Sequence, residues 1–562
     1  MRRLSLFKSF KWKLFLASAA IIFADNLFYK NGLSGGYIGI FAFGVLLCLV
    51  LCRRSIWQRW QGSVAALCAL AFCGALILDP GPLAWLLFWV AISMAALFGT
   101  TTPYDDGWLW LQRMVLHGLR SPIAPFIDAR KFARVWRKPR DRRFRLRAFV
   151  PILALPLGGS AIILILFATA NPIIADALGM IRLPDLSAVT PARLALWLAI
   201  FAFSWSLLRA RAARSLIPTF DGRGDLPLAG VSVASVKLSL ILFNILFAIE
   251  NMLDIAYLSR ALPLPRGMTI AAYVHRGAYP LIVTALLAGL FVLVTLRPGS
   301  STAAVPAIRR LVMLWIVQNM ILVASSIQHT LDYVDASMFT ALRIHALAWM
   351  ALVAAGLLLI YWRMLREKDA AWLINMNMLL AALTLSFFSF FDAGEAAAWW
   401  NVRHAREVTG RGPALDLCHL RQLGPSALLP LIELEGRPLT RPFKERVQSV
   451  RSDIQETMIY IDHQGGWTLR NEYRLDMARK RLKTIKSIPL PAGERDCHGI
   501  LVQHAPPAAE ATPAPASTTP TLTQAKEQCS CVLCRARSSS SMTIPIFDSF
   551  SSSPSARLGS TR

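Results

Sequence analysis

The sequence predicts an all-α membrane protein: a polytopic bundle of about eleven transmembrane helices, then a small α-helical extracytoplasmic region and a disordered tail. Three observations support this fold class. Of the 562 residues, 55% are hydrophobic, and the mean hydropathy is +0.47, which exceeds that of ordinary globular domains. Nearly uncharged runs of 17 or more residues recur along the chain, and this length crosses a bilayer. Basic residues, which give a net charge of +27, concentrate in alternate loops.

Eleven apolar segments follow a basic start, MRRLSLFKSFKWK. A secretory signal peptide begins in a similar way, but here the apolar run continues into many further spans, so we expect the first segment to stay as an anchor. The first four spans form residues 1–98, and the last seven form a membrane core over 148–391. With boundaries uncertain by about four residues, the predicted spans are 14–29, 33–51, 62–78, 81–98, 148–170, 192–208, 233–257, 276–296, 310–329, 341–361 and 370–391.

The charge of the loops predicts the orientation. If the N-terminus lies in the cytoplasm, the segments on that side hold 30 Lys and Arg residues and the opposite loops hold 7. Positive residues concentrate in cytoplasmic loops, and one span too many or too few would mix the two groups. The sequence therefore predicts a multi-pass protein of the bacterial cytoplasmic (inner) membrane, with the N-terminus inside and the C-terminus outside.

The largest cytoplasmic loop, residues 99–147, has two parts. In the first part, apolar residues recur at helical spacing, at Trp108, Leu111, Val115 and Leu119, which predicts an amphipathic helix along the membrane surface. The second part is a polybasic run, which either attracts anionic lipids by about 1 kcal/mol per residue or only anchors the topology. The basic residues expected to face lipid are Arg130, Lys131, Arg134, Arg137, Lys138, Arg140, Arg142, Arg143, Arg145 and Arg147.

After the last span the composition changes. Residues 392–486 are charged and contain helical stretches at 395–407, 441–462 and 468–486, separated by Gly and Pro turns. This pattern predicts a small α-helical extracytoplasmic region. From 487 to 562, Pro, Ala, Ser and Thr dominate, so we expect a disordered tail.

Polar side chains lie inside the span 233–257, although an ionisable group at the centre of a membrane helix costs about 2.5–3.5 kcal/mol on insertion scales. Lys237, Asn244 and Asn251 are seven residues apart, so they drift by only ~20° per step. Glu250 and Asp254 fall beside them, in an arc of about 120°. Lipid cannot satisfy these groups. The stripe therefore joins helices, or it lines a path for an ion, proton or solute.

A second polar stripe follows the span 310–329. Gln318, Ser325 and Asp332 are also seven apart, and His329 lies within about 60° of them. We expect this stripe to face the first inside the bundle. There, carboxylates beside a histidine relay protons or hold a cation, or they only bond helices together. The predicted polar membrane core is Lys237, Asn244, Glu250, Asn251, Asp254, His275, Arg276, Gln318, Asn319, His329, Asp332 and Arg343.

We predict no catalytic residue, no cofactor and no metal. His404, Cys418 and His419 lack the spacing of a closed zinc site. The nine cysteines show no paired framework, and the tail motif CxCxxC at 529–534 either binds metal, forms a disulfide or has no role. The GxxxxGK[ST], HExxH and GxSxG motifs do not occur, so phosphate-loop, zincin and hydrolase chemistry lack their usual signatures.

The blocks FNILFAIENMLDIAYL, YVHRGAYPLI and LWIVQNMILVASSI precede the segment NVRHAREVTGRGPALDLCHLRQLGPSALLPLIEL. Together they resemble a bacterial family of polytopic membrane proteins that is known only as a domain of unknown function, of the 4153/4173 type. Asn401, Asp416 and Leu420 occupy recognisable positions in it. The resemblance covers about residues 100–480. It implies membership of the family, and no activity or catalytic residue.

Three function classes stay open. A membrane sensor, scaffold or assembly factor, which we rank first, predicts a dry polar core and an outer helical region that serves a protein partner in the envelope. An ion- or proton-coupled transporter or channel predicts water at Glu250 and Asp254. A membrane enzyme acting on lipid or glycan predicts a carboxylate-lined cleft. Expected partners are membrane lipids with anionic head groups at the cytoplasmic loop, and no nucleic acid, because no binding module is apparent.

Overall fold

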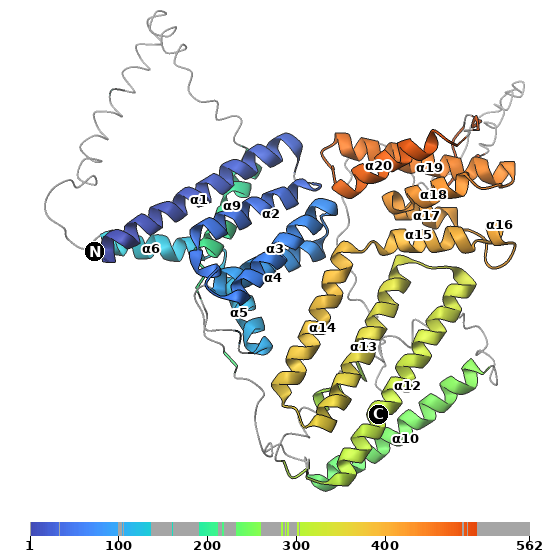
Figure 1. Ribbon diagram of the computed structural model, residues 1–562, viewed down its shortest axis with the longest axis horizontal. Helices are drawn as coiled ribbons and strands as arrows, with labels where there is room; N and C mark the ends of the chain where they lie inside the picture. Colours follow the sequence, from blue (N-terminus) through green and yellow to red (C-terminus); the bar gives the residue numbers. More distant parts are fainter. Residues whose placement is uncertain are drawn as a thin grey trace, which may run out of the picture. The chain divides into compact units, whose positions relative to one another are not determined.

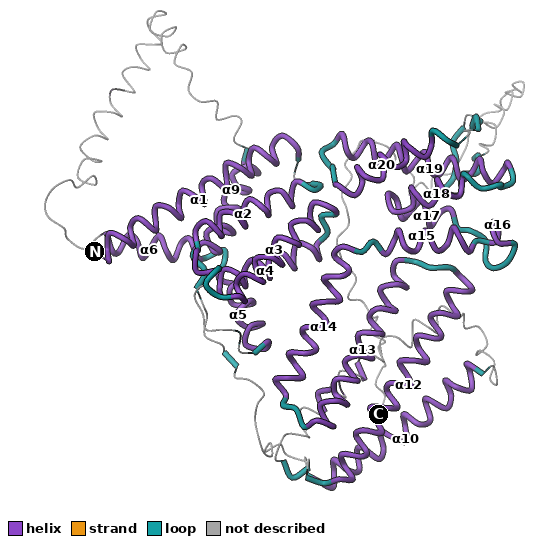
Figure 2. The backbone as a smooth tube through the Cα atoms, viewed as in Figure 1, coloured by secondary structure: helices purple, strands orange, loops and turns teal. Residues whose placement is uncertain are grey.

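The computed structural model describes residues 2–32, 34–98, 106–136, 190–211, 232–259, 304–485 and, except 492, 488–502, with a few isolated positions between them. This described part of the chain is built from helices (Figure 1). It contains no strand (Figure 2), and its only β pairing is an isolated bridge between Arg495 and Leu501.

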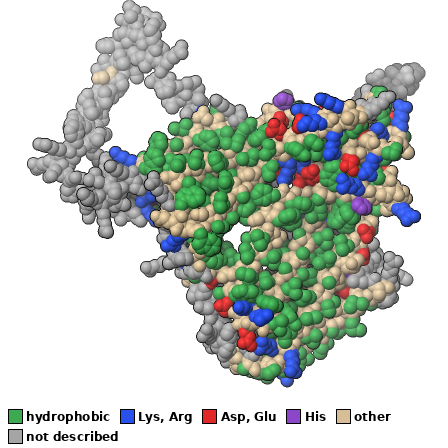
Figure 3. All heavy atoms as spheres, in the orientation of Figure 1, with side chains coloured by type: hydrophobic (Ala, Val, Ile, Leu, Met, Phe, Trp, Pro, Cys, Tyr) green, Lys and Arg blue, Asp and Glu red, His purple; other side chains and the backbone are tan. Residues whose placement is uncertain are grey.

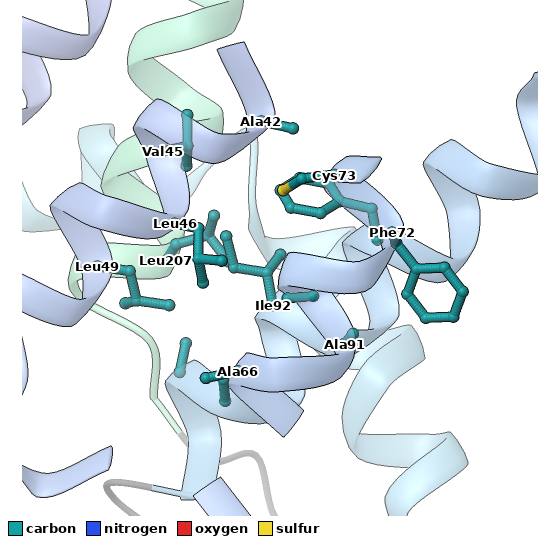
Figure 4. Packing of buried hydrophobic residues seen from close by; sticks show 14 of the residues in the cluster. Ala42, Val45, Leu46, Leu49, Ala66, Phe72, Cys73, Ala91, Ile92 and Leu207 are labelled. Carbon is teal, nitrogen blue, oxygen red and sulfur yellow. The ribbon is translucent and has the colours of Figure 1, made fainter. Parts of the chain in front are cut away.

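Five apolar helices of the N-terminal part pack around small residues. Ala69, Ala75 and Ala95 are fully buried, and such residues let helix backbones approach closely. Figure 4 shows how Leu46, Ile92 and Leu207, from three of these helices, meet in one core. The five helices are α1 (Arg2–Asn31), α2 (Tyr37–Cys52), α3 (Trp60–Leu78), α4 (Pro82–Phe98) and α9 (Pro191–Leu208).

Two shorter helices follow α4: α5 (Gly107–Arg120) and α6 (Ala124–Trp136). Asp106 begins α5 as its N-cap, because its carboxylate accepts a hydrogen bond of 2.9 Å from the Trp108 backbone N–H. This bond satisfies one of the unpaired donors at a helix start.

Four further helices form a second apolar core, in which Leu240, Ile308 and Ile316 are fully buried. Thr340 and Asp369 cap the starts of two of them. The four are α10 (Val233–Leu258), α12 (Pro306–Ser337), α13 (Ala341–Arg366) and α14 (Ala370–Phe390).

The C-terminal helices form a third apolar core. Leu420, Leu431 and Val447 are fully buried. A buried ion pair lies within this core, because Arg451 Nε donates to Glu435 Oε2 at 2.8 Å. The helices are α15 (Ala393–His404), α16 (Arg406–Thr409), α17 (Leu417–Leu423), α18 (Leu428–Glu435), α19 (Arg441–His463) and α20 (Leu469–Leu482).

Seven of the described helices are long and apolar enough to cross a membrane, and two shorter ones, α2 and α4, are apolar as well. These helices lie at nine of the predicted spans; the other two, 148–170 and 276–296, fall outside the described residues except at isolated positions. Figure 3 shows apolar side chains over α12–α14 and charged side chains over the C-terminal helices. The prediction of a helical membrane protein is confirmed.

Candidate functional site

The two predicted polar stripes meet along a seam between α10 and α12. Asn251 Nδ2 donates to the Gln318 carbonyl at 3.2 Å, and Asn244 Nδ2 donates to the Leu311 carbonyl at 3.1 Å. Both bonds join residues 67 apart in sequence, so the two helices run parallel and in register. Seven residues separate the two asparagines, which returns each of them to the same line of contact.

Each asparagine binds both helices at once. Besides the bond across the seam, Asn244 donates to Leu240 of its own helix at 2.7 Å, and Asn251 donates to Phe247 at 2.8 Å. Both side chains are buried, where an unpaired amide N–H would be costly. The amide donors are therefore satisfied within the helix pair.

A carboxylate, a hydroxyl and an imidazole lie together further along the seam. Ser325 Oγ donates to Asp254 Oδ2 at 2.6 Å, and His329 Nε2 lies 3.7 Å from Asp254 Oδ1. All three residues are less than 10% exposed. A carboxylate beside an imidazole can share a proton or hold a cation, so this group carries the titratable chemistry of the seam.

Aromatic rings cover the seam on the side of Asn244. Trp315 packs against Phe243, Phe247 and Phe291, with ring centroids 5.4, 5.9 and 5.8 Å apart. This cluster makes the surroundings of the amides apolar, which strengthens their hydrogen bonds.

The structure corrects the prediction for three members of the stripes. Lys237, Glu250 and Asp332 are exposed and lie outside the seam. One helix residue turns the side chain by about 100°, so Glu250 points well away from the contact line that its neighbour Asn251 occupies. Asp332 instead accepts a hydrogen bond of 2.9 Å from Gln328 on its own helix.

The other described members of the predicted core have local roles. Asn319 is buried and donates to Trp315 in its own helix at 2.8 Å. The Gln318 side chain is half-buried, and only its backbone carbonyl serves the seam. Arg343 binds the Ser337 carbonyl at the end of α12 at 2.9 Å, where a cation complements the helix dipole.

The remaining predicted residues fall mostly outside the described part. His275 and Arg276 lie there, as do Arg137, Lys138, Arg140, Arg142, Arg143, Arg145 and Arg147. Lys131 and Arg134 belong to α6, and Arg130 of the same helix is exposed.

A second polar site joins the C-terminal helices to the membrane helices. Arg470 Nη1 lies 3.1 Å from Asp79 Oδ2, between α3 and α4, and Arg470 Nη2 donates to the Phe390 carbonyl at 2.6 Å. The Gly36 N–H donates to the Trp467 carbonyl at 2.5 Å. The start of α20 therefore contacts three separate segments that follow or precede membrane helices.

A buried arginine organises the junction of α14 and α15. Arg474, only 3% exposed, donates to Asp392 at 2.5 Å and to Glu395 at 2.6 Å. Burial raises the pKa of Asp392, but hydrogen bonds from Arg474, the Glu395 backbone and Ser426 outweigh it, so this pKa lies below its ordinary value. Arg474 therefore stabilises the ionised form of the Asp392 carboxylate.

A disulfide closes the C-terminal helices. Cys418 of α17 and Cys497 are bonded across 79 residues, which corrects the prediction that the cysteines have no paired framework. His404 stacks on Trp400 at 3.8 Å and does not join Cys418. Among the described residues, Cys418, Cys497 and His498 are the one group with metal-ligand spacing, and their two sulfur atoms are bonded to each other.

The comparisons assign the family. The family model described as Domain of unknown function (DUF4153) matches residues 16–434. The chain belongs to the DUF4153 family. Neither the curated proteins nor the solved structures include a match to it. The match begins earlier and ends earlier than the predicted 100–480, so it includes the second half of α1 and all of α2–α4, and it ends within α18.

The positions that carry the DUF4153 resemblance have structural roles. Asn401 is buried and pairs with the turn between α12 and α13. Asp416 caps α17, because its carboxylate accepts a bond of 2.9 Å from the His419 N–H. Leu420 is fully buried in the C-terminal core. The described contacts of these positions hold the fold together.

Ion pairs around two carboxylates of the DUF4153 chain were not predicted from the sequence. Asp25 of α1 accepts bonds from Arg193 Nε at 2.7 Å and from Trp197 Nε1 at 2.9 Å. Asp128 of α6 pairs with Arg211 and with Arg209 at 3.4 Å. A lone carboxylate within the first apolar segment is itself a signal, and the same rule that selected Asp254 selects Asp25.

Proposed function

We propose that this DUF4153 protein is an eleven-span bacterial inner-membrane protein, and that it acts as a scaffold, sensor or assembly factor rather than as a carrier of ions. In this proposal, the extracytoplasmic C-terminal helices form the surface that serves a protein partner. The membrane helices hold that surface in place. The seam between α10 and α12 stabilises the membrane part.

The contacts of the described loops support the predicted topology. The C-terminal helices contact the segment before α2, Asp79, Phe390 and Phe339. All four lie at or next to the predicted outer ends of membrane spans. On the predicted inner side, Gly107 donates to Asn375 at 2.7 Å.

The helix directions support the two spans that the structure does not describe. Because α10 and α12 run parallel, the chain has to cross back between them, as a span at 276–296 would. The start of α9 contacts α1 through Arg193 and Asp25, near the predicted outer end, and Arg53 donates to the Leu208 and Ala210 carbonyls at 3.4 and 3.0 Å, near the inner end. Since α4 ends on the inner side, a crossing before α9, as at 148–170, completes the count.

The observation that carries the function is the pairing of polar groups within the seam. The amides of Asn244 and Asn251 donate to carbonyls of both helices, and Asp254 accepts from Ser325. Hydrogen bonds of this kind hold membrane helices together, which is what a scaffold or sensor requires of its membrane part. Glu250, which the transport hypothesis placed on the path, is exposed.

Transport of protons or cations is the second candidate. It is favoured by one contact, the 3.7 Å approach of His329 to Asp254. Two buried titratable groups at this distance can exchange a proton. The two hypotheses therefore differ in whether Asp254 transfers protons or cations, or only accepts hydrogen bonds that hold the helices together.

Flux measurements separate the candidates. The purified chain is reconstituted into vesicles that contain a pH-sensitive dye, and a pH gradient with a potassium diffusion potential is applied. We expect the same slow leak for wild type, Asp254→Asn, Glu250→Gln and protein-free vesicles. A flux of wild type that Asp254→Asn abolishes and Glu250→Gln retains would establish transport instead.

Labelling tests the topology. In a background without free cysteines, Arg411→Cys places a thiol in the exposed turn after α16, and Arg120→Cys places one at the end of α5. We expect an impermeant maleimide to label the first in whole cells and the second only after permeabilisation. The reverse pattern, or equal labelling, would overturn the eleven-span topology.

A further inference from the structure

The α5 helix has one buried face and one apolar exposed face. Trp110 and Met114 are buried, and the ring of Trp110 packs 4.3 Å from that of Phe98 in α4. On the other side, Leu111, Val115 and Leu119 are exposed, the last by 67%. Residues at i, i+4 and i+8 form one stripe, and a water-facing stripe would ordinarily be polar.

The apolar surface continues into the next helix. Ile123, Phe126 and Ile127, in the turn and first part of α6, are also exposed, with Phe126 at 68%. We call these three residues together with Leu111, Val115 and Leu119 the α5–α6 apolar face. Such a contiguous surface usually marks an interaction with a membrane or with another protein.

Two polar contacts hold this face in a fixed position. Asn375 Oδ1 of α14 accepts bonds from the Gly107 N–H at 2.7 Å and from the Tyr104 hydroxyl at 3.2 Å. Asp128, 3% exposed, accepts a bond of 3.2 Å from Trp205 Nε1 of α9. Both helices of the α5–α6 unit are therefore bound to helices of membrane length.

The surroundings of the face favour lipid as its occupant. Arg120 and Arg130 are exposed beside it, and residues 99–147 hold 12 basic side chains. Trp57 and Trp60 are exposed by 55% and 74%, and Gln61 accepts a bond of 3.2 Å from the Tyr104 N–H, which ties this tryptophan-bearing turn to the segment before α5. Exposed tryptophans with arginines are typical of a membrane–water interface.

We propose that the α5–α6 apolar face lies within one leaflet of the bilayer as an interfacial element, with Arg120 and Arg130 at the level of anionic head groups. The assignment to the inner leaflet rests on the topology of the proposed function. The insertion of the face into lipid does not depend on that topology, because lipid surrounds the protein in a vesicle whichever way the protein is oriented.

Spin labels measure the insertion directly. Leu119→Cys and Phe126→Cys are labelled separately in the full chain without other free cysteines, and the chain is reconstituted into phosphatidylcholine–phosphatidylglycerol vesicles. Collision rates are measured with oxygen, which concentrates in lipid, and with a water-soluble nickel chelate. Leu383→Cys on the exposed face of α14 is the lipid reference, and Arg411→Cys is the water reference.

We expect oxygen-to-nickel ratios at positions 119 and 126 close to the lipid reference and at least tenfold above the water reference. Ratios equal to the water reference would overturn the proposal. Low collision rates with both reagents would also overturn it, because they would show that a protein covers the face. Replacing phosphatidylglycerol by phosphatidylcholine should lower the ratios by severalfold, and unchanged ratios would exclude the head-group contact of the arginines.

Discussion

Asn401 and the backbone of Phe339 exchange two hydrogen bonds, each 2.8 Å long. The Asn401 side chain accepts from the Phe339 N–H and donates to the Phe339 carbonyl. The preceding residue, Met338, has a φ of 64°, which is uncommon for a residue other than glycine. One buried amide of the C-terminal helices thus fixes the tight turn between two membrane helices.

Replacing Asn401 should therefore weaken the whole assembly. Asn401→Ala removes two bonds of about 1 kcal/mol each and leaves a partly buried N–H and C=O unpaired, so we expect a loss of about 2–4 kcal/mol. Unfolding by sodium dodecyl sulfate in mixed micelles measures it. Gln464→Ala removes an exposed amide and should change little. Equal stability of both variants would show that the Asn401–Phe339 hydrogen bonds are dispensable.

The seam predicts a difference between two asparagines. Asn251→Ala removes a bond between helices, so we expect a loss of about 0.6–2 kcal/mol. Asn377 donates to Leu373 of its own helix at 2.9 Å, and Asn377→Ala is the matched control with a smaller loss. The same micelle titration measures both. A larger loss for Asn377→Ala would contradict the role of the seam.

The disulfide predicts resistance to alkylation and a stability that depends on redox conditions. Closing a loop of 79 residues contributes about 4 kcal/mol in the chain-entropy model. We expect the Cys418→Ser, Cys497→Ser pair of substitutions to lower the unfolding temperature of the C-terminal helices in the full chain. Mass spectrometry should find Cys418 unmodified by iodoacetamide until a reductant is added. Rapid modification without reductant would exclude the bond.

His117 predicts a pH dependence. Burial, with a smaller effect of the Arg53 charge, lowers its pKa from 6.5 to about 4. The folded chain keeps this side chain neutral while the unfolded chain protonates it, so stability is complete above pH 6.5 and falls as the pH drops toward 4, by at most about 3 kcal/mol. The measurement is amide exchange in α5 at several pH values. His117→Phe should remove the slope between pH 6.5 and 4; an unchanged slope would assign it to other groups.

The contact between the loop before α2 and Trp467 predicts that substitution of Gly36 in this loop destabilises the docking of α20. A Cβ on Gly36 would lie 2.8 Å from the Ile77 carbonyl and 2.9 Å from the Trp467 ring, so Gly36→Ala should cost about 1–3 kcal/mol. A Cβ on Gly74 meets no atom within 4 Å, and Gly74→Ala is the control. Protease cleavage near Trp467 should accelerate for the first variant alone. Equal cleavage would show that the contact does not hold α20.

Helical periodicity predicted the seam because a membrane makes polar positions conspicuous. It put Asn244 and Asn251 on one line, since residues seven apart return to one line, and in the structure these residues and Asp254 bond to α12. It failed for Glu250, because an arc of about 120° is wider than the contact between two helices. Packing between helices decides which part of a polar arc touches a neighbour, and the sequence of one helix does not determine that packing.

Other features had no local signal. The short helices α17 and α18 follow Gly and Pro residues that predicted turns. Cys418 and Cys497 are 79 residues apart, and nothing in their spacing pairs them. Arg193 lies at the start of a predicted span, whereas its partner Asp25 lies 168 residues earlier. Pairings of this length come from tertiary structure alone.

The contact between the first outer loop and α20 also sets an order of assembly. Ser34 and Gly465, which share a hydrogen bond, are 431 residues apart, and Gly36 binds the nearby Trp467. Synthesis runs from the N-terminus, and early segments fold before late ones exist. The loop before α2 therefore lacks its partners, Gly465 and Trp467, while the membrane helices are synthesised. A chain that stops before Trp467 leaves that loop open, so closure of this one contact distinguishes a finished molecule from an interrupted one.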